Sequence, residues 1–413
     1  MTDERTSAFT LLRQRDYMLF WASRWTGGMG GLIQSVTIGW QVYEVARVTM
    51  TVAEASLMLG MVGLVSFLPV LGLALPAGES ADRHDRRRVL LLCLTAEMTT
   101  VAALCGLAIT GGATVPILLV MAALFGCARA FFAPANTAMG PMLVPRELLP
   151  RAIAWNSLAW QSSAIVGPAL GGVLVAISPA LGYGVALALY ATAAVCVALI
   201  RTSTQPQVQP GSRWALMQEG LRYVWTNKIV FGAISLDLAA VLLAGATAML
   251  PVFARDILHV GPEGFGMLRA APAVGATGVA LVLAANPIKA HAGRIMFAGV
   301  AVFAAATIGF GASRIWWVSV GLLALLGAAD MLSVYVRQTL VQLVTPDPMR
   351  GRVAAVSTLF IGASNELGEF RAGLAARLVG PVLAVLVGGV LALAVTGAWI
   401  RMFPALWRAD RLE

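Results

Sequence analysis

Residues 78–90 read Gly78-Glu79-Ser80-Ala81-Asp82-Arg83-His84-Asp85-Arg86-Arg87-Arg88-Val89-Leu90. This interval is rich in charge, and an apolar run lies on each side of it, at 52–77 and at 88–110. Each run exceeds the ~20 residues that a helix needs to cross the hydrocarbon core of a bilayer. The interval therefore predicts a tight turn at one membrane surface, bearing a carboxylate and a basic cluster.

The composition of the whole chain agrees with a membrane protein. Of its 413 residues, 59% are apolar and only 12% are charged, about half of the ~25% charge that is usual in soluble domains. This balance excludes a disordered chain, a collagen-like chain and a disulfide-rich secreted scaffold. Twelve apolar segments are expected as helices, at 17–44, 52–77, 88–110, 115–142, 152–177, 179–200, 228–254, 263–286, 294–312, 315–343, 353–376 and 381–403.

One long polar connector, 201–227, divides these segments into six plus six. We therefore expect an N-terminal six-helix bundle at 1–200, a cytoplasmic linker at 201–227 and a C-terminal six-helix bundle at 228–413. Within the linker, Trp214 to Trp225 has the composition of a helix that lies in the membrane interface. The expected fold class is an all-α integral membrane protein with two pseudo-symmetric bundles.

The two halves share short patterns. A shift of 201 residues places Leu143-Val144-Pro145 on Val344-Thr345-Pro346 and Arg151 on Arg352. Internal duplication of six-helix units is one way in which transporters build a central binding site.

The distribution of basic residues predicts the orientation. With the N-terminus placed in the cytoplasm, the inside loops and tails hold 20 Lys and Arg, and the outside loops hold only 4. An excess of positive charge marks the cytoplasmic side, so both termini are expected there. Residues 1–16 lack a small-residue cleavage site before the first apolar run, so we expect no cleaved signal peptide.

The charged interval resembles the conserved loop motif GxxxDRxGRRxxL of the major facilitator superfamily. The matching positions are Gly78, Asp82, Arg83, Arg86, Arg87 and Leu90. Asp85 stands where the motif has glycine. The resemblance implies a cytoplasmic gate, in which Asp82 and Arg83 brace the positive N-terminal end of helix 11. The alternative is that the arginines only anchor the loop to anionic lipid.

A second pattern lies in the fifth apolar segment, Gly167-Pro168-x-x-Gly171-Gly172. Small residues allow close helix contact, and proline removes one backbone hydrogen bond. The pattern is similar to the antiporter motif of exporters in this superfamily. It favours export over uptake.

Six ionisable side chains are placed deep within the expected helices: Arg24, Arg129, Asp237, Asp330, Glu366 and Glu369. A charge at the bilayer centre costs ~3 kcal/mol on insertion scales, so such a residue faces an aqueous cavity or a partner. We therefore treat these six residues as candidates for the pathway of substrate and protons.

The candidate residues have different expected roles. The resemblance implies that Arg129, in helix 4, binds anionic or polar groups. The acids can exchange protons, which is the chemistry that proton coupling requires. The alternative is that they form static ion pairs with Arg129, Arg337 or Arg371, and Asp330 with Arg337, seven residues apart on one helix face, most resembles such a pair. Arg24 lies close enough to the cytoplasmic end either to extend toward water or to line the cavity.

Further stretches resemble the enterobactin (catecholate siderophore) exporter branch of the superfamily. They are Gly220-Leu221-Arg222-Tyr223, Leu250-Pro251-Val252-Phe253-Ala254, Gly264-Phe265-Gly266-Met267-Leu268 and Pro348-Met349-Arg350-Gly351-Arg352-Val353. The resemblance implies a proton-coupled exporter of a siderophore-like metabolite or an amphipathic drug, working by alternating access in the bacterial inner membrane. The alternatives are a nutrient proton symporter and a sensor or scaffold that does not transport.

The remaining expectations concern partners and chemistry. The four cysteines lie in apolar runs without a CxxC pair, so we expect no metal and no disulfide. No Gly-Lys nucleotide-binding loop is present, so we expect no ATP, no other cofactor and no enzymatic activity. The partners are expected to be a small-molecule substrate, protons and the lipid bilayer, without nucleic acid, and the protein is expected to be a monomer.

Overall fold

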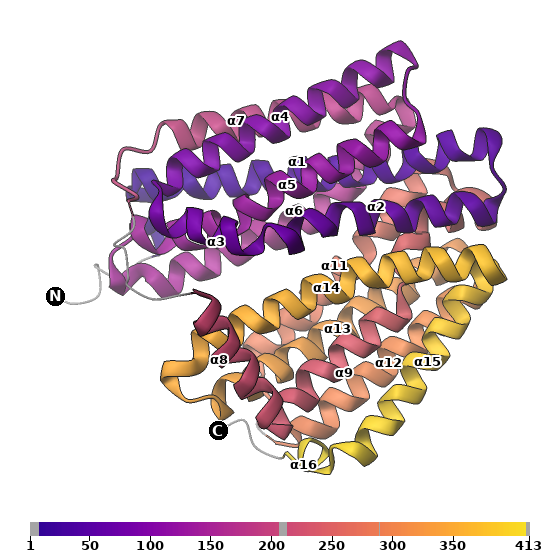
Figure 1. Ribbon diagram of the computed structural model, residues 1–413. Helices are drawn as coiled ribbons and strands as arrows, with labels where there is room; N and C mark the ends of the chain where they lie inside the picture. Colours follow the sequence, from indigo (N-terminus) through magenta and orange to yellow (C-terminus); the bar gives the residue numbers. More distant parts are fainter. Residues whose placement is uncertain (1–7, 206–212, 289, 410–413) are drawn as a thin grey trace. The chain divides into compact units, whose positions relative to one another are not determined.

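The computed structural model describes residues 8–205, 213–288 and 290–409, and no strand occurs among them (Figure 1). The long helices are α1 (Arg15–Thr49), α2 (Val52–Gly72), α4 (Arg86–Thr110), α5 (Val115–Met139), α6 (Leu149–Ile177), α7 (Pro179–Ala198), α9 (Lys228–Ala244), α11 (Gly261–Ala285), α12 (Ala292–Ala312), α13 (Trp316–Val344), α14 (Asp347–Val379) and α15 (Pro381–Met402). The short ones are α3 (Ala74–Arg83), α8 (Arg213–Thr226), α10 (Leu250–Val252) and α16 (Pro404–Trp407).

The helices have the length and polarity of membrane spans. Within the described part of the chain, ten segments are long and apolar enough to cross a bilayer. The remaining long helices, α1 and α14, have 35 and 33 residues, which also exceeds the ~20 residues required. Large apolar side chains lie exposed on the helix surfaces, among them Leu92, Ile177 and Leu378, each at least 70% exposed. The expectation of an all-α membrane protein is confirmed.

The chain divides into two compact units. Unit 1 consists of Met1–Val45 and Val65–Pro210, and unit 2 of Ala46–Leu64 and Gly211–Glu413. Unit 2 thus takes in the segment between α1 and the middle of α2, which the sequence analysis assigned to the N-terminal bundle. The boundaries 1–200, 201–227 and 228–413 stay a prediction, and residues 206–212 of the expected linker lie outside the described residues.

In unit 1, the interior holds hydrogen bonds between helices. The Tyr183 hydroxyl of α7 donates to Gln41 Oε1 of α1 at 2.7 Å, and Tyr190 donates to Gln34 Oε1 at 3.0 Å. All four side chains are buried. In a dry interior each unpaired polar atom is costly, so these pairs fix the register of α1 against α7.

Unit 2 is built around α13, which packs against α11 and α12. The α11–α13 contact depends on glycine, because a Cβ on Gly275 would lie 1.8 Å from the carbonyl oxygen of Ala324. A Cβ on Gly327 would lie 1.9 Å from the carbonyl oxygen of Pro272. Close backbone approach of this kind supplies van der Waals contact between helices, which replaces the hydrophobic driving force that is lost in lipid.

Two of the expected helices are interrupted. The expected segment 52–77 is divided between α2 and α3 at Leu73. The expected segment 228–254 breaks at Gly245, where the backbone turns left-handed at φ +52°. A 3-10 turn (Ala246–Met249), α10 and a π-helix (Phe253–Ile257) then continue it. Glycine adopts this φ readily, and the apolar composition of the segment gave no sign of it.

The glycine contact between α11 and α13 yields a test with a matched control. Gly275→Ala should destabilise the protein by ~1–3 kcal/mol, because its methyl group meets a backbone oxygen that cannot rotate away. Gly278→Ala, three residues further along α11, meets nothing within 4 Å and should leave stability unchanged. The apparent melting temperature in detergent measures both, and equal values for the two variants would contradict the packing described here.

Candidate functional site

A buried ion pair lies in the interior of unit 2. Arg337 of α13 extends one terminal nitrogen to 3.3 Å from Asp237 Oδ2 of α9. Arg337 is 2% exposed and Asp237 is 7% exposed. Removal of two charges from water is expensive and is offset only when the charges lie close together. The pair therefore ties α9 to α13 in the middle of the helical bundle.

Two further groups interact with this pair. The other terminal nitrogen of Arg337 donates to Ser357 Oγ of α14 at 3.4 Å. Asp330, two turns before Arg337 on α13, acts electrostatically on both Asp237 and Arg337. The structure thus brings together two of the predicted site residues, Asp237 and Asp330, around one guanidinium.

The pairing differs from the expectation in one respect. The sequence analysis favoured Asp330, seven residues before Arg337 on the same helix face, as the ion-pair partner of Arg337. The observed ion pair joins Arg337 to Asp237, which is 100 residues away in the sequence. The spacing of Asp330 and Arg337 on one helix face was visible in the sequence. The approach of α9 was not.

Unit 1 contains a second charged pair. Arg129 of α5 is exposed, and it acts electrostatically on Glu97 of α4, which is 5% exposed. Glu97 was not among the predicted site residues, because a lone acid in an apolar run does not reveal its neighbour. The signal that could have identified it is the general rule that a charge within a span requires a partner.

The remaining predicted charges lie elsewhere. Arg24 of α1 is half-buried, with its guanidinium carbon 5.8 Å from the centre of the Phe20 ring, within the range of a cation–π contact. Glu366 and Glu369 of α14 are half-buried in unit 2. Glu369 packs on Gly63, where a Cβ would lie 3.0 Å from Glu369 Oε2.

The charged interval 78–90 is more helical than expected. Gly78 and Asp82 lie within α3, and the turn is confined to His84 and Asp85. Arg83 forms an ion pair with Glu79 at 2.8 Å along α3. The Asp85 side chain accepts the backbone N–H of Arg87 at 3.1 Å and so begins α4. This capping role accounts for a carboxylate where the loop motif has glycine.

The basic residues of this interval bind backbone carbonyls inside unit 1. Arg86 donates from Nε to the Ala81 oxygen at 3.2 Å and from a terminal nitrogen to the Ala138 oxygen at 3.0 Å. Arg87 donates to the Ala198 oxygen at the end of α7. Cations at helix C-terminal ends are favourable. These contacts join α3, α5 and α7 at one end of the unit.

The second motif lies at a helix contact in unit 1. Gly167, Pro168, Gly171 and Gly172 are buried within α6, which continues through Pro168. A Cβ on Gly167 would lie 2.9 Å from Leu32 Cβ, and one on Gly171 would lie 3.2 Å from Ile33 Cα. The small residues therefore allow α6 to pack directly on α1.

Comparison with known proteins gives similar chains over most of the length. A family model described as transmembrane secretion effector matches residues 6–411. The enterobactin exporter EntS of Citrobacter koseri is 27% identical over 317 residues, which cover 75% of this chain and 74% of that protein. EntS of Escherichia coli O139:H28 is 28% identical over 315 residues, covering 75% and 73%.

A solved structure has the same arrangement of helices. The POT family transporter PepTSo superposes with a TM-score of 0.73 and covers 95% of this chain and 98% of its own. The two sequences are 14% identical, so the likeness concerns the fold alone.

Because Arg337 interacts with two acids, removing Arg337 and removing one of the acids should have unequal effects on stability. Arg337→Gln leaves two buried carboxylates without their counter-ion and should cost ~3–5 kcal/mol of stability. Asp237→Asn should cost less, because Asp330 remains to balance Arg337. Titration with SDS from mixed micelles measures the free energy of unfolding. Arg401→Gln, at the exposed end of α15, serves as the control, and a larger loss for Asp237→Asn than for Arg337→Gln would contradict the shared arrangement.

Proposed function

Because the chain belongs to the transmembrane secretion effector family of the major facilitator superfamily, we propose that it is a proton-coupled exporter of a small organic molecule. The fold class and the superfamily that residues 78–90 indicated are thereby confirmed. The chain is a multi-pass membrane protein and a secondary transporter. Export, proton coupling and the substrate class are the content of the proposal.

One observation carries the assignment of export. The secretion family matches residues 6–411, and exporters align over 75% of the chain. The close contact of α6 with α1 through Gly167 and Gly171 supports it, because this contact underlies the motif typical of exporters. We therefore infer that the protein moves its ligand outward and does not convert it chemically.

The substrate class follows from the relatives and from the charges. The two most similar relatives described above are enterobactin exporters, so we propose a siderophore-like metabolite, with an amphipathic drug as the other class. Arg129 is exposed on α5 and is the residue that we propose to bind an anionic or polar group of the substrate.

Proton coupling is assigned to the charges in unit 2. One guanidinium, Arg337, can neutralise only one of the two carboxylates, Asp237 and Asp330. An uncompensated charge in a dry interior is costly. The group of three is neutral when one carboxyl carries a proton, so we propose that Asp330 takes up and releases that proton during turnover. Glu366 and Glu369 remain candidates for proton or cation recognition.

Location, orientation and gating complete the proposal. We propose the bacterial inner membrane, with both termini in the cytoplasm, on the basis of the 20 to 4 distribution of basic residues. The gate formed by Gly78, Asp82, Arg83, Arg86 and Arg87 stays a prediction. So does the monomeric state.

Transport can be tested in inside-out vesicles with an acid interior and a pH-sensitive dye. Addition of a catecholate siderophore should release protons from vesicles that contain the protein, whereas vesicles without it should show no release. A lipophilic cationic drug, added separately, tests the second substrate class. Release with neither compound would contradict these two substrate classes, and substrate movement unaffected by the proton gradient would contradict proton coupling.

The proton site can be tested apart from substrate binding. Asp330→Asn should abolish substrate-driven proton release and retain substrate exchange at equilibrium, because the amide keeps the shape but cannot give up a proton. Glu263→Gln, which neutralises an exposed acid in the first turn of α11, should transport normally. If Asp330→Asn releases protons at the rate of the unaltered protein, the role of Asp330 is refuted.

A further inference from the structure

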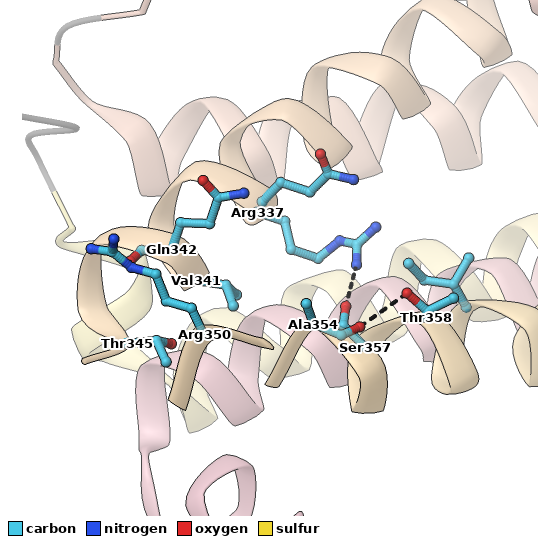
Figure 2. Close-up of a pocket in the computed structure, with 10 residues that line it drawn as sticks. Arg337, Val341, Gln342, Thr345, Arg350, Ala354, Ser357 and Thr358 are labelled. Carbon is cyan, nitrogen blue, oxygen red and sulfur yellow. Dashed lines mark hydrogen bonds between the residues drawn. The ribbon is translucent and has the colours of Figure 1, made fainter. Parts of the chain in front are cut away.

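A cavity of about 240 Å³ lies between α13 and α14, entirely within unit 2 (Figure 2). The lining residues are Arg337, Gln338, Val341, Gln342, Thr345, Arg350, Ala354, Ser357, Thr358 and Ile361. Two arginines are among them, and no acid is among the described lining residues. The charge of Arg337 is balanced by its ion pair with Asp237, so the further positive charge of the lining comes from Arg350.

The lining residues follow the helical repeat. Arg337 and Val341 of α13 and Thr345, the residue after its end, are spaced four apart and are buried, so they form the floor. Gln338 and Gln342, next to them on the same helix, are exposed at the rim. Residues four apart lie on one face of a helix. The floor and the rim of the cavity are therefore two adjacent faces of α13.

Two polar atoms on the floor have no hydrogen-bond partner. They are Nε of Arg337 and Oγ1 of Thr345. Both residues are 2% exposed. Buried polar groups are almost always hydrogen-bonded, and both of these atoms can donate. The two residues are eight positions apart, about 12 Å along the helical rise, so one small ligand reaches only one of these atoms. Thr345 Oγ1, at the Arg350 end of the cavity (Figure 2), points to a ligand that accepts a hydrogen bond there.

The rim brings a second positive charge to the same cavity. Arg350 of α14 is fixed by donation from its Nε to the Gln342 carbonyl oxygen at 3.0 Å. Ser357 and Thr358 add hydroxyl groups from α14. Guanidinium and hydroxyl groups that line a cavity favour carboxylate or phosphate oxygens.

The size of the cavity limits the ligand. Pockets that enclose drug-sized molecules measure ~300–1,000 Å³, and this one is smaller. It suits a small anion or one anionic group of a larger molecule.

We propose that the α13–α14 cavity is a binding site for a small oxyanion, either a carboxylate or a phosphate. Thr345 Oγ1 and the Arg350 guanidinium donate to its oxygens. This site goes beyond the export proposal, because binding of the oxyanion can be measured whether or not the protein transports a substrate.

Arginine variants two residues apart provide the test. Inorganic phosphate and succinate are titrated separately into the purified full-length protein in phosphatidylcholine nanodiscs, at constant ionic strength, by isothermal titration calorimetry. Arg350→Gln should weaken binding about tenfold, the loss expected for a charge-assisted hydrogen bond. Arg352→Gln removes the same charge from α14, where Arg352 instead pairs with Glu219 of α8 at 2.6 Å, and should leave binding within about twofold of the unaltered protein.

A third variant tests the floor of the cavity. Thr345→Val keeps the shape of the side chain and removes the unpaired hydroxyl, so it should weaken binding about threefold or more. It leaves both arginines in place and relieves an unsatisfied buried group, so the protein should still fold. Retained affinity in Thr345→Val together with retained affinity in Arg350→Gln would overturn the site.

The lipid composition of the nanodiscs distinguishes two sources of the oxyanion, a lipid headgroup and a soluble anion. In nanodiscs that contain phosphatidylglycerol, a phosphate affinity of the unaltered protein that falls as the lipid content rises would identify a lipid headgroup as the occupant, and unchanged affinity would identify a soluble anion. Either result supports the site. No saturable binding of either probe in phosphatidylcholine, or equal losses in Arg350→Gln and Arg352→Gln, would refute it. Transport activity does not enter this test, so its failure leaves the export proposal standing.

Discussion

The constraint on which this structure depends is that lipid offers no hydrogen bonds. Backbone groups within a bilayer must be satisfied inside the protein, so each spanning segment is a helix. Where α9 ends at Gly245, most residues beside the break are buried, namely Ala244, Ala246, Ala248, Met249 and Leu250. The departure from the α-helix therefore lies mainly against protein.

The same constraint governs the charges. Arg337 and Asp237 are almost fully buried, so they pair with each other at 3.3 Å and bind α9 to α13 more specifically than apolar contact could. Glycine at the α11–α13 and α6–α1 contacts also holds helices together, because it lets their backbones approach closely. The resulting van der Waals contact replaces the hydrophobic effect, which is absent between helices in lipid. Polar pairs therefore set the register, and small residues set the distance between helices.

The sequence predicts the features that depend on apolar composition and on the spacing of residues along the chain. It does not predict the features that depend on which helices contact each other. The positions of the helices follow from apolar length, and residues 78–90 indicate the superfamily. Glycine at 245 is one of many glycines in the chain, so its left-handed conformation could not be singled out. The sequence favoured Asp330 as the partner of Arg337, because the two lie on one helix face, and it could not show that α9 brings Asp237 to the guanidinium.

Arginine is required at position 337 for a geometric reason. Its planar group has three nitrogens that point in different directions. One terminal nitrogen meets Asp237, the other meets Ser357, and Nε is at the floor of the α13–α14 cavity. A lysine has a single charged nitrogen and could not contact α9, α14 and the cavity from one position. The residue that stabilises the interior of unit 2 is thus also a residue that lines the cavity.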